Sequence, residues 1–396
     1  MAEAIRAEKG VPIVPETLRW AMERMGLTPG DIAKTAGVKF ERVQAWLEGK
    51  SRPTHVQTHK VARRLGIGFL TLLLPPEGRL DHIDLPDFRH GPRKGERPSP
   101  TLLAVIRDVR RKSNWYADFR REPNRYVGKF AHDRPEAAAA KTAEELGVRT
   151  LRDVSKSWTE FLERLSDAIE DRFDILVLRN YVLGNNTKRP LDPEEFSGFS
   201  ITGPGAPALF VNTAAKAGSI AHAIFTLAHE LGHVLRGEPG LDDETGTGFG
   251  PRVERFCDAF AAALLMPKEE FHHVWARGGR NTFKRCQGAA KHFKVSARAC
   301  LYRAAELRLI GRPEVEPTLE AIREAERLEL EKPVRGRLDF YSTQIERKNS
   351  RKFVQALMHA VIEGEEGYTR AASLLGVRLD TLLEKLDRWM EERRGV

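Results

Sequence analysis

Three residues within five positions carry the most specific chemical signal of the chain: His229, Glu230 and His233. They lie in SIAHAIFTLAHELGHVLRG (219–237), whose apolar residues recur at helical spacing, so we expect one amphipathic helix there. Histidines four positions apart project from the same helix face, about one turn from each other. Two imidazoles placed in this way can reach one Zn²⁺ ion at roughly 2.0–2.1 Å. The spacing therefore predicts a zinc site with a carboxylate beside it.

Glu230 follows the first of these histidines, which places its carboxylate close to the same ion. Zinc lowers the pKa of a bound water toward about 7, and a neighbouring carboxylate can take the proton as the oxygen attacks a carbonyl. The resulting carboxylic acid can then protonate a leaving amine. These residues predict a peptide-bond hydrolase with Glu230 as its catalytic group.

A site of this kind needs a third protein ligand, and the segment RVERFCDAFAAALLMP (252–267) offers one on a second predicted helix. Glu254 can complete the ligand set. Asp258, one turn later, can accept the other N–H of a zinc-bound histidine and fix its orientation. Glu238 and Glu244 are rival third ligands, but each lies in a glycine-rich loop without such a partner.

The paired motifs FTLAHELGHVLRG and VERFCDAFAAALLMP resemble the ImmA/IrrE family of gluzincin metallopeptidases over roughly residues 135–312. The resemblance implies an α+β zincin-like domain with His229, His233 and Glu254 as zinc ligands and Glu230 as the catalytic carboxylate. It also implies that the substrate is a helix-turn-helix repressor, whose cleavage switches on mobile-element or stress-response genes. Cys257 departs from the family, which mostly has Ala at this position. We expect Cys257 to be tolerated as a small buried residue, and the alternative is a redox-sensitive thiol near the metal.

The α+β assignment also depends on short apolar runs that precede the histidine helix. DILVL (174–178) and ALFVN (208–212) are expected to be strands, with GFSIT (198–202) as a further one and 185–196 as a polar loop. ALFVN is either an edge strand on which an extended substrate could lie or an ordinary core strand. No oxyanion stabiliser can be assigned: Tyr181, His222, His272 and His273 are only within plausible reach along the sequence.

Residues 15–75 predict a compact set of short helices. Thr28, Pro29 and Asp31 are typical of a helix start, and Gly37 then separates this helix from VKFERVQAWLEG, which gives a helix-turn-helix pattern. DIAKTAGV, GKSRP and KVARRLGI resemble the XRE-type helix-turn-helix family, which implies DNA binding. The expected DNA-facing residues are Lys39, Arg42 and Gln44 for bases, and Lys50 and Arg52 for phosphates. Pro29 and Glu41 depart from the pattern, so docking of a protein is the alternative.

The chain of 396 residues is long enough for several domains. We expect an all-α helix-turn-helix domain (1–78), a linker and connecting helix (79–134), the metallopeptidase domain (135–312) and a helical C-terminal domain (313–396). YTRAASLLGVRLDTLLEKLDRW near the end repeats the helix, glycine, helix pattern, and packing or dimerisation is expected there rather than DNA contact. A homodimer is left open.

Composition narrows the classes of function. No segment approaches the roughly 18 consecutive apolar residues of a membrane span, so a cytoplasmic protein without a membrane partner is expected. Three cysteines without a CxxC pair favour neither disulfides nor a cysteine-rich zinc site. The net charge of +9 is compatible with a polyanion but does not require one.

Three hypotheses of function follow from these observations. The first is a zinc endopeptidase fused to its own helix-turn-helix module, which cleaves a partner repressor or antitoxin and so controls stress-response, mobile-element or toxin–antitoxin genes. The second is a DNA-binding transcription regulator or antitoxin whose zinc site is structural or silent. The third is a stress sensor whose site stays closed until a ligand or partner arrives.

Overall fold

The chain folds into two compact units. The computed structural model describes residues 10–25, 27–65, 67–75, 98–183, 186–203, 205–214, 219–237, 251–279, 281–330 and 344–394. The N-terminal unit comprises Met1–Leu85 and Lys94–Arg107, and the C-terminal unit comprises Pro86–Arg93 and Asp108–Val396. Residues 76–97, which include the start of the expected linker and connecting helix (79–134), lie outside the described residues.

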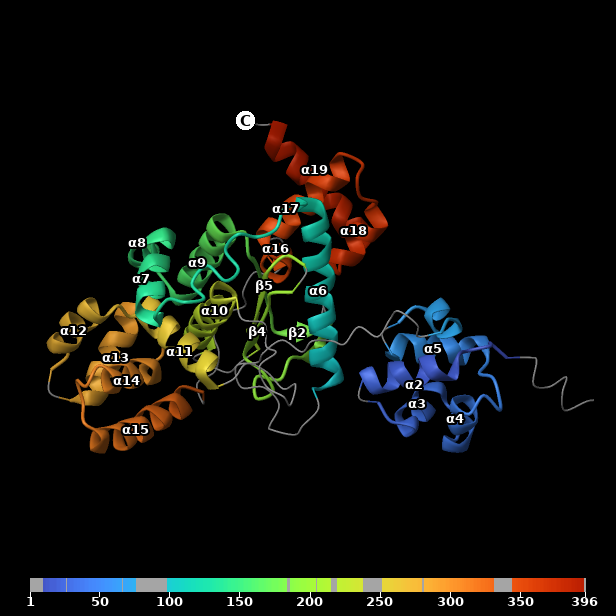
Figure 1. Cartoon of the computed structure of the whole chain (residues 1–396), viewed down its shortest axis with the longest axis horizontal. Coiled ribbons are helices and arrows are strands. Elements are labelled where there is room, and N and C mark those ends of the chain that lie inside the picture. Colours follow the sequence, from blue (N-terminus) through green and yellow to red (C-terminus); the bar gives the residue numbers. More distant parts are fainter. Residues whose placement is uncertain are drawn as a thin grey trace, which may run out of the picture. The chain divides into compact units, whose positions relative to one another are not determined.

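The N-terminal unit is helical in its described residues, and its helices surround one apolar core (Figure 1). Its elements are α2 (Pro15–Arg24), α3 (Pro29–Ala36), α4 (Phe40–Leu47), α5 (His55–Leu65) and the 3₁₀ helix η1 (Phe69–Leu73). The core includes Leu18, Ile32, Trp46 and Leu65, which are at most 1% exposed. Amphipathic helices of this length depend on such a core, because they are too short to be stable alone.

The two short helices expected on either side of Gly37 are α3 and α4. The Thr28 side chain accepts a hydrogen bond from the backbone N–H of Asp31 and the Asp31 carboxylate accepts one from the N–H of Thr28, a capping box that starts α3. Gly37 ends α3 in the left-handed conformation, at φ 69°. Val43 and Trp46 of α4 are buried, as expected for the inward face of the second helix.

A three-stranded sheet of order β1–β5–β4 organises the C-terminal unit. β1 (Leu176–Asn180) pairs in parallel with β5 (Ala208–Asn212), and β4 (Gly198–Ile201) pairs with β5 antiparallel. The interpretation of 208–212 as an edge strand is therefore wrong: β5 is the central strand, and the outer position beside it is taken by β4. The polar segment expected to be a loop includes β3 (Asn186–Pro190), which pairs with β2 (Val182–Leu183).

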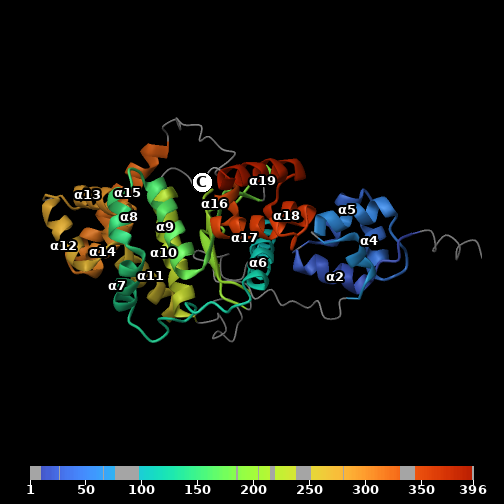
Figure 2. The same ribbon diagram turned by 90° about the horizontal axis from the view of Figure 1, so that it is seen from above.

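Helices cover the sheet on two sides (Figures 1 and 2). On one side lie α9 (Trp158–Phe173), which contacts β1, and α10 (Ser219–Arg236), which contacts β4 and β5. Outside α10 lie α11 (Pro251–Leu265) and α7 (Pro135–Leu146), with α8 (Val148–Val154) next to α9. The apolar side chains of these layers form one core, as a fold that must bury a sheet face under helices requires.

A helical group extends this core away from the sheet. It consists of α12 (Lys268–Arg277), α13 (Thr282–Phe293), α14 (Ala297–Glu306) and α15 (Arg312–Leu330). α13 packs on α12, α14 and α15, and its buried Phe293 stacks on Phe271 of α12. Leu319 and Ile322 of α15 belong to the same apolar core.

The C-terminal helices cover the other side of the sheet together with the second part of α6 (Pro100–Arg120) (Figure 2). They are α16 (Gln344–Asn349), α17 (Arg351–Ile362), α18 (Tyr368–Leu375) and α19 (Leu379–Arg394), of which α16 and α17 contact β1. The expected pattern of two helices separated by a glycine is also found near the C-terminus. Gly376 ends α18 at φ 67°, and α19 follows.

Charges of opposite sign join α17 to α9. The Arg351 guanidinium lies 2.6 Å from Asp171 and 3.2 Å from Asp167, and the Lys352 ammonium lies 2.7 Å from Asp174. The carboxylate of Glu170, 2% exposed, accepts hydrogen bonds from the backbone N–H groups of Val177 and Lys352, both at 3.2 Å. This carboxylate therefore links α9, β1 and the first turn of α17.

None of the helices in the described part of the chain is long and apolar enough to cross a membrane.

Candidate metal centre

The two histidines of the motif face each other on α10. Both are buried, and their Nε2 atoms are 3.1 Å apart. Burial under α11 and the sheet lowers the pKa of His233, mainly because the charged imidazolium would be desolvated. A neutral imidazole is the form that binds a metal ion, so the surroundings favour ligation.

Glu254, in the first turn of α11, places its carboxylate over both rings. Its Oε2 lies 3.4 Å from Nε2 of His229, and its Oε1 lies 3.3 Å from Nε2 of His233. Ligands held at 2.0–2.1 Å in a tetrahedron are about 3.3–3.4 Å from one another. The separations of 3.1–3.4 Å therefore fit three ligands of one tetrahedral ion. In the described parts of the chain, this is the one group of three or more His, Cys, Asp or Glu residues close enough to hold a metal ion.

Asp258 orients the first of these ligands. Its Oδ1 lies 3.0 Å from Nδ1 of His229, on the side of the ring opposite Nε2. A carboxylate there fixes the tautomer in which Nδ1 carries the proton and Nε2 presents its lone pair. Glu254 and Asp258, one helical turn apart on α11, therefore contact the two ring nitrogens of the same histidine.

Glu230 is fully buried between α10 and the outer strand β4. β4 can come this close because it begins with Gly198: a Cβ there would lie 2.5 Å from Thr226 Cγ2, 2.8 Å from the carbonyl oxygen of Phe210 and 3.5 Å from Glu230 Cγ. Sequence reasoning missed Gly198, although a glycine inside an otherwise bulky strand indicates close approach of another segment. Gly198 therefore helps to shape the space around the Glu230 side chain.

Gly232 allows a similarly close approach on the side of α10 that faces α11. A Cβ at Gly232 would lie 3.1 Å from Phe260 and 3.3 Å from the Cys257 sulfur, so α11 packs directly on the backbone of α10. This close packing brings Glu254 within reach of the histidines. Burial raises the pKa of the Cys257 thiol far above its usual range, and a protonated, inaccessible thiol does not support the redox alternative.

A loop far away in sequence holds the C-terminal end of α10. The backbone N–H groups of Gly128 and Phe130 donate to the carbonyls of Val234 and Leu235, at 3.0 and 2.8 Å. Gly237 follows the helix at φ 70°, and a Cβ there would lie 2.2 Å from the Gly128 Cα. These bonds satisfy carbonyls that a helix end leaves without partners, and they fix the last turn after His233. No local sequence signal indicates this contact.

The other candidates lie elsewhere. His222 pairs with the Ser197 hydroxyl at 2.8 Å, and His273 with the Glu269 carbonyl at 2.7 Å. Tyr181 lies under the Lys348 ammonium, 6.0 Å from its ring centre. Neither these residues nor His272 joins the metal-ligand group, and Glu238 and Glu244 lie outside the described residues. No oxyanion stabiliser is assigned.

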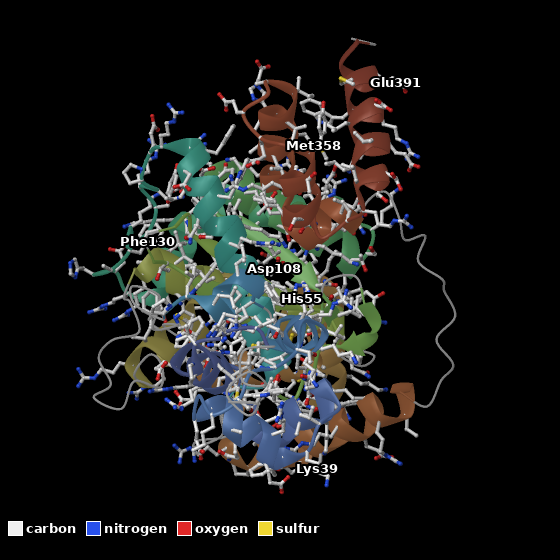
Figure 3. The ribbon with its side chains drawn as sticks, turned by 90° about the vertical axis from the view of Figure 1, so that its right-hand side faces the viewer. Lys39, His55, Asp108, Phe130, Met358 and Glu391 are labelled. Carbon is white, nitrogen blue, oxygen red and sulfur yellow. The ribbon has the colours of Figure 1, made fainter. Side chains whose placement is uncertain are left out.

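The candidate DNA-contacting residues are on the surface of the N-terminal unit. Lys39 (labelled in Figure 3) and Arg42 are exposed on α4, whereas Gln44 is half-buried. Of the two residues expected at phosphates, Arg52 is exposed and Lys50 forms a 2.7 Å ion pair with Glu48. Four of the five side chains are thus exposed to solvent. One of these four, Lys50, already has an ion-pair partner that would compete with phosphate.

Comparison with known families agrees with the buried site. Residues 170–305 match the family model of the M78 peptidases, described as an IrrE N-terminal-like domain. The match covers about a third of the 396-residue chain and includes all the residues of the metal-ligand group. No curated protein and no solved structure matches the chain significantly. The C-terminal unit therefore carries a metallopeptidase-like domain.

Proposed function

We propose that this chain is a zinc-dependent endopeptidase in which His229, His233 and Glu254 hold the metal ion and Glu230 is the catalytic residue. The observation that supports it is the set of ligand-to-ligand separations of 3.1–3.4 Å beside a fully buried glutamate, inside the region that matches a peptidase family.

The chemistry follows from where each group lies. A zinc ion at this position supplies a Lewis acid that polarises a peptide carbonyl and acidifies water. Glu230 accepts the proton of the attacking water and delivers it to the leaving amine, a transfer that adds about 10²–10⁴-fold in rate. Its full burial keeps other water molecules away from the carboxylate. Asp258 holds the His229 ring in the tautomer that ligation needs.

The N-terminal unit, in this proposal, brings the peptidase to its target. Residues 1–75 carry twelve Lys and Arg against seven Asp and Glu, which is +5 of the +9 of the whole chain. A basic helix-turn-helix unit suits operator DNA. We propose a DNA-associated repressor or antitoxin as the substrate, because a protein bound at the same operator is presented to the peptidase at high local concentration.

The proposal is tested by metal content and cleavage measured on the full chain. Zinc is expected at about one per chain in the wild type and in Glu230→Gln, and to be lost in His229→Ala and Glu254→Ala. Cleavage of a peptide library, read by mass spectrometry, is expected only for the zinc-loaded wild type and to stop with a chelator. A wild type that binds no zinc, or a Glu230→Gln variant that cleaves as well as the wild type, contradicts the proposal.

A second candidate is a DNA-binding regulator whose peptidase domain is silent, and the charge excess of residues 1–75 favours it. In this case Lys39→Ala with Arg42→Ala abolishes operator occupancy in cells, while Glu230→Gln leaves both occupancy and gene expression unchanged. A change in gene expression with Glu230→Gln at unchanged occupancy excludes it.

A further inference from the structure

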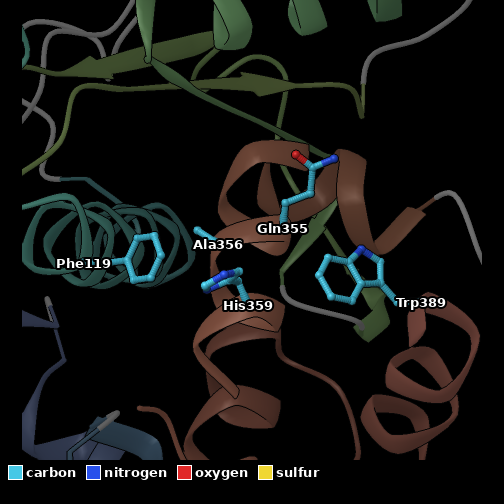
Figure 4. A pocket seen from close by; sticks show the side chains of 5 residues that line it. All are labelled: Phe119, Gln355, Ala356, His359 and Trp389. Carbon is cyan, nitrogen blue, oxygen red and sulfur yellow. The ribbon is translucent and has the colours of Figure 1, made fainter. Parts of the chain in front are cut away.

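A cavity of about 530 Å³ lies in the C-terminal unit, away from the metal-ligand residues (Figure 4). It is lined by Phe119 of α6, by Gln355, Ala356 and His359 of α17, and by Trp389 of α19. Its volume is in the range of sites that hold small molecules, about 300–1,000 Å³. Neither the proposed peptidase reaction nor the helix-turn-helix uses these residues.

The cavity exists because α17 has a small residue on this face. The large apolar side chains of α17, among them Phe353, Leu357 and Met358, are buried against the rest of the unit. Ala356 is too small to fill the space between α6 and α19, and Phe119 and Trp389 stand on either side of the Gln355 and His359 side chains in Figure 4. Gln355 and His359 are exposed and the other three lining residues are half-buried, so the cavity is open to solvent.

The Phe119 wall is held firmly in place. Its ring stacks on Trp115, with centroids 5.4 Å apart and 9° between the planes. The Trp115 indole N–H donates to the buried Glu366 carboxylate at 2.7 Å, and its ring meets Phe353 edge-on at 5.4 Å. A wall fixed in advance loses little entropy when a ligand binds, which favours affinity.

The lining indicates the chemistry of the ligand. Three of the five side chains are aromatic, and none is a carboxylate, an ammonium or a guanidinium. Aromatic side chains stack on nucleobases with about 1–3 kcal/mol per base. The Gln355 amide offers a donor and an acceptor side by side, the pattern that pairs with the N6 and N7 edge of adenine.

We propose that this cavity is a binding site for an adenine base or nucleoside, stacked against the aromatic walls and read by Gln355. The site joins α6, α17 and α19, and α17 is tied through Glu170 to α9 and β1. Occupancy therefore holds the C-terminal helices together on the peptidase-like domain. The proposal does not depend on zinc or on peptidase activity.

The test is calorimetric titration of the zinc-loaded full chain with adenosine and with purine riboside, which lacks only the exocyclic amine. For ligands of this size we expect a dissociation constant on the order of 0.1 mM for adenosine. Purine riboside is expected to bind up to about tenfold more weakly, because one hydrogen bond is missing. Gln355→Leu should remove this difference between the two ligands.

Further variants locate the site. Ala356→Leu fills the cavity floor and Trp389→Leu removes one wall, so each is expected to weaken adenosine binding at least tenfold. Tyr368→Leu, which changes an exposed aromatic residue of α18 outside the cavity, is the matched control and should bind as the wild type does. Absence of saturable binding at a few millimolar adenosine overturns the proposal. Binding that Ala356→Leu and Trp389→Leu leave unchanged overturns it as well, and equal affinity for the two nucleosides overturns the assignment of Gln355.

Discussion

The metal centre of the C-terminal unit and the helix α4 of the N-terminal unit place their polar side chains in opposite surroundings. His229, Glu230 and His233 are buried, and each is positioned by packing of α10 against β4 and α11. Lys39 and Arg42 stand in solvent on a short helix whose opposite face is buried. In the first region, the position of each polar side chain depends on the elements packed around it. In the second region, it depends only on the helix that carries the side chain.

This difference predicts how each region responds to substitution. A buried polar or charged group costs free energy unless its partners are in place, so changes there affect stability and metal affinity strongly. Removal of an exposed cation costs little unfolding free energy. Such a cation contributes mainly through screened, long-range attraction to a polyanion. Four predictions, ordered from the largest expected effect to the smallest, sharpen or break this contrast.

The largest effect is expected at Glu170, a buried carboxylate of the C-terminal unit. Burial raises its pKa to about 7, despite hydrogen bonds from Ser350, Val177 and Lys352 that favour the charged form. In the unfolded chain a glutamate titrates near 4.3, so folding binds a proton between these two pH values. Stability is therefore fully present below about pH 4.3 and is lost as the pH rises to about 7, by about 4 kcal/mol in total.

Glu170→Gln removes this titration. Relative to the wild type, the variant is expected to gain about 4 kcal/mol of unfolding free energy between about pH 4.3 and pH 7, as measured by urea unfolding of the C-terminal unit at each pH. Glu365→Gln, at an exposed position of the same unit, is the control and should show no such trend. If the unfolding free energies of Glu170→Gln and of the wild type change with pH in the same way, burial does not raise the pKa of this carboxyl group.

The second prediction concerns Asp258, whose carboxylate orients His229 from a position that is itself 58% exposed in its side chain. Asp258→Asn removes the charge that stabilises the Nδ1–H tautomer, so zinc affinity is expected to fall about 10–100-fold. The measurement is competition with a chromogenic chelator. Arg255→Gln, three positions earlier on α11, is the control. An unchanged affinity in Asp258→Asn would mean that the carboxylate does not support the ligand.

The third prediction concerns Gly198, where β4 meets side chains of α10 and the backbone of β5. In Gly198→Ala the new methyl group would lie 2.5 Å from Thr226 Cγ2 and 2.8 Å from the Phe210 carbonyl oxygen. Overpacking of this kind costs about 1–3 kcal/mol of unfolding free energy, because Thr226 and the β5 backbone must shift to make room. Gly203→Ala has no atom within 4 Å of its new Cβ and serves as the control. Equal stability and equal cleavage in the two variants would refute tight packing at Gly198.

The smallest effects are expected in the N-terminal unit, at Lys50 and Arg52. If both contact phosphate, Arg52→Ala lowers the slope of log affinity against log salt by about 0.9. Lys50→Ala should change it less, because its ammonium already lies 2.7 Å from Glu48. The readout is fluorescence anisotropy of a labelled duplex at several salt concentrations. A larger effect of Lys50→Ala than of Arg52→Ala would contradict the structural ranking, and an affinity independent of salt would exclude phosphate contact.

Local sequence signals were sufficient to predict many of the helices and the candidate site residues of this protein. The HELGH spacing, the following ExxxD and the small Gly232 identify a pair of helices that close on one site, because helical periodicity fixes which side chains share a face. The Thr28 capping box and the left-handed Gly37 are equally local, and α3 begins and ends where these residues predict it. Strand bounds were less well placed: the run expected at 174–178 is a strand at 176–180.

Contacts between segments that lie far apart in the sequence were decided by the tertiary structure. It places 208–212 in the middle of the sheet and β4 at its outer edge, because strand order depends on pairing between distant segments. It also puts Gly198 against Glu230, bonds Gly128 to the end of α10 and leaves a cavity above Ala356. The sequence by itself thus determined which residues could do chemistry, since residue type and helical spacing are local. Only the packed structure decided which of them meet, since burial and close approach arise between elements.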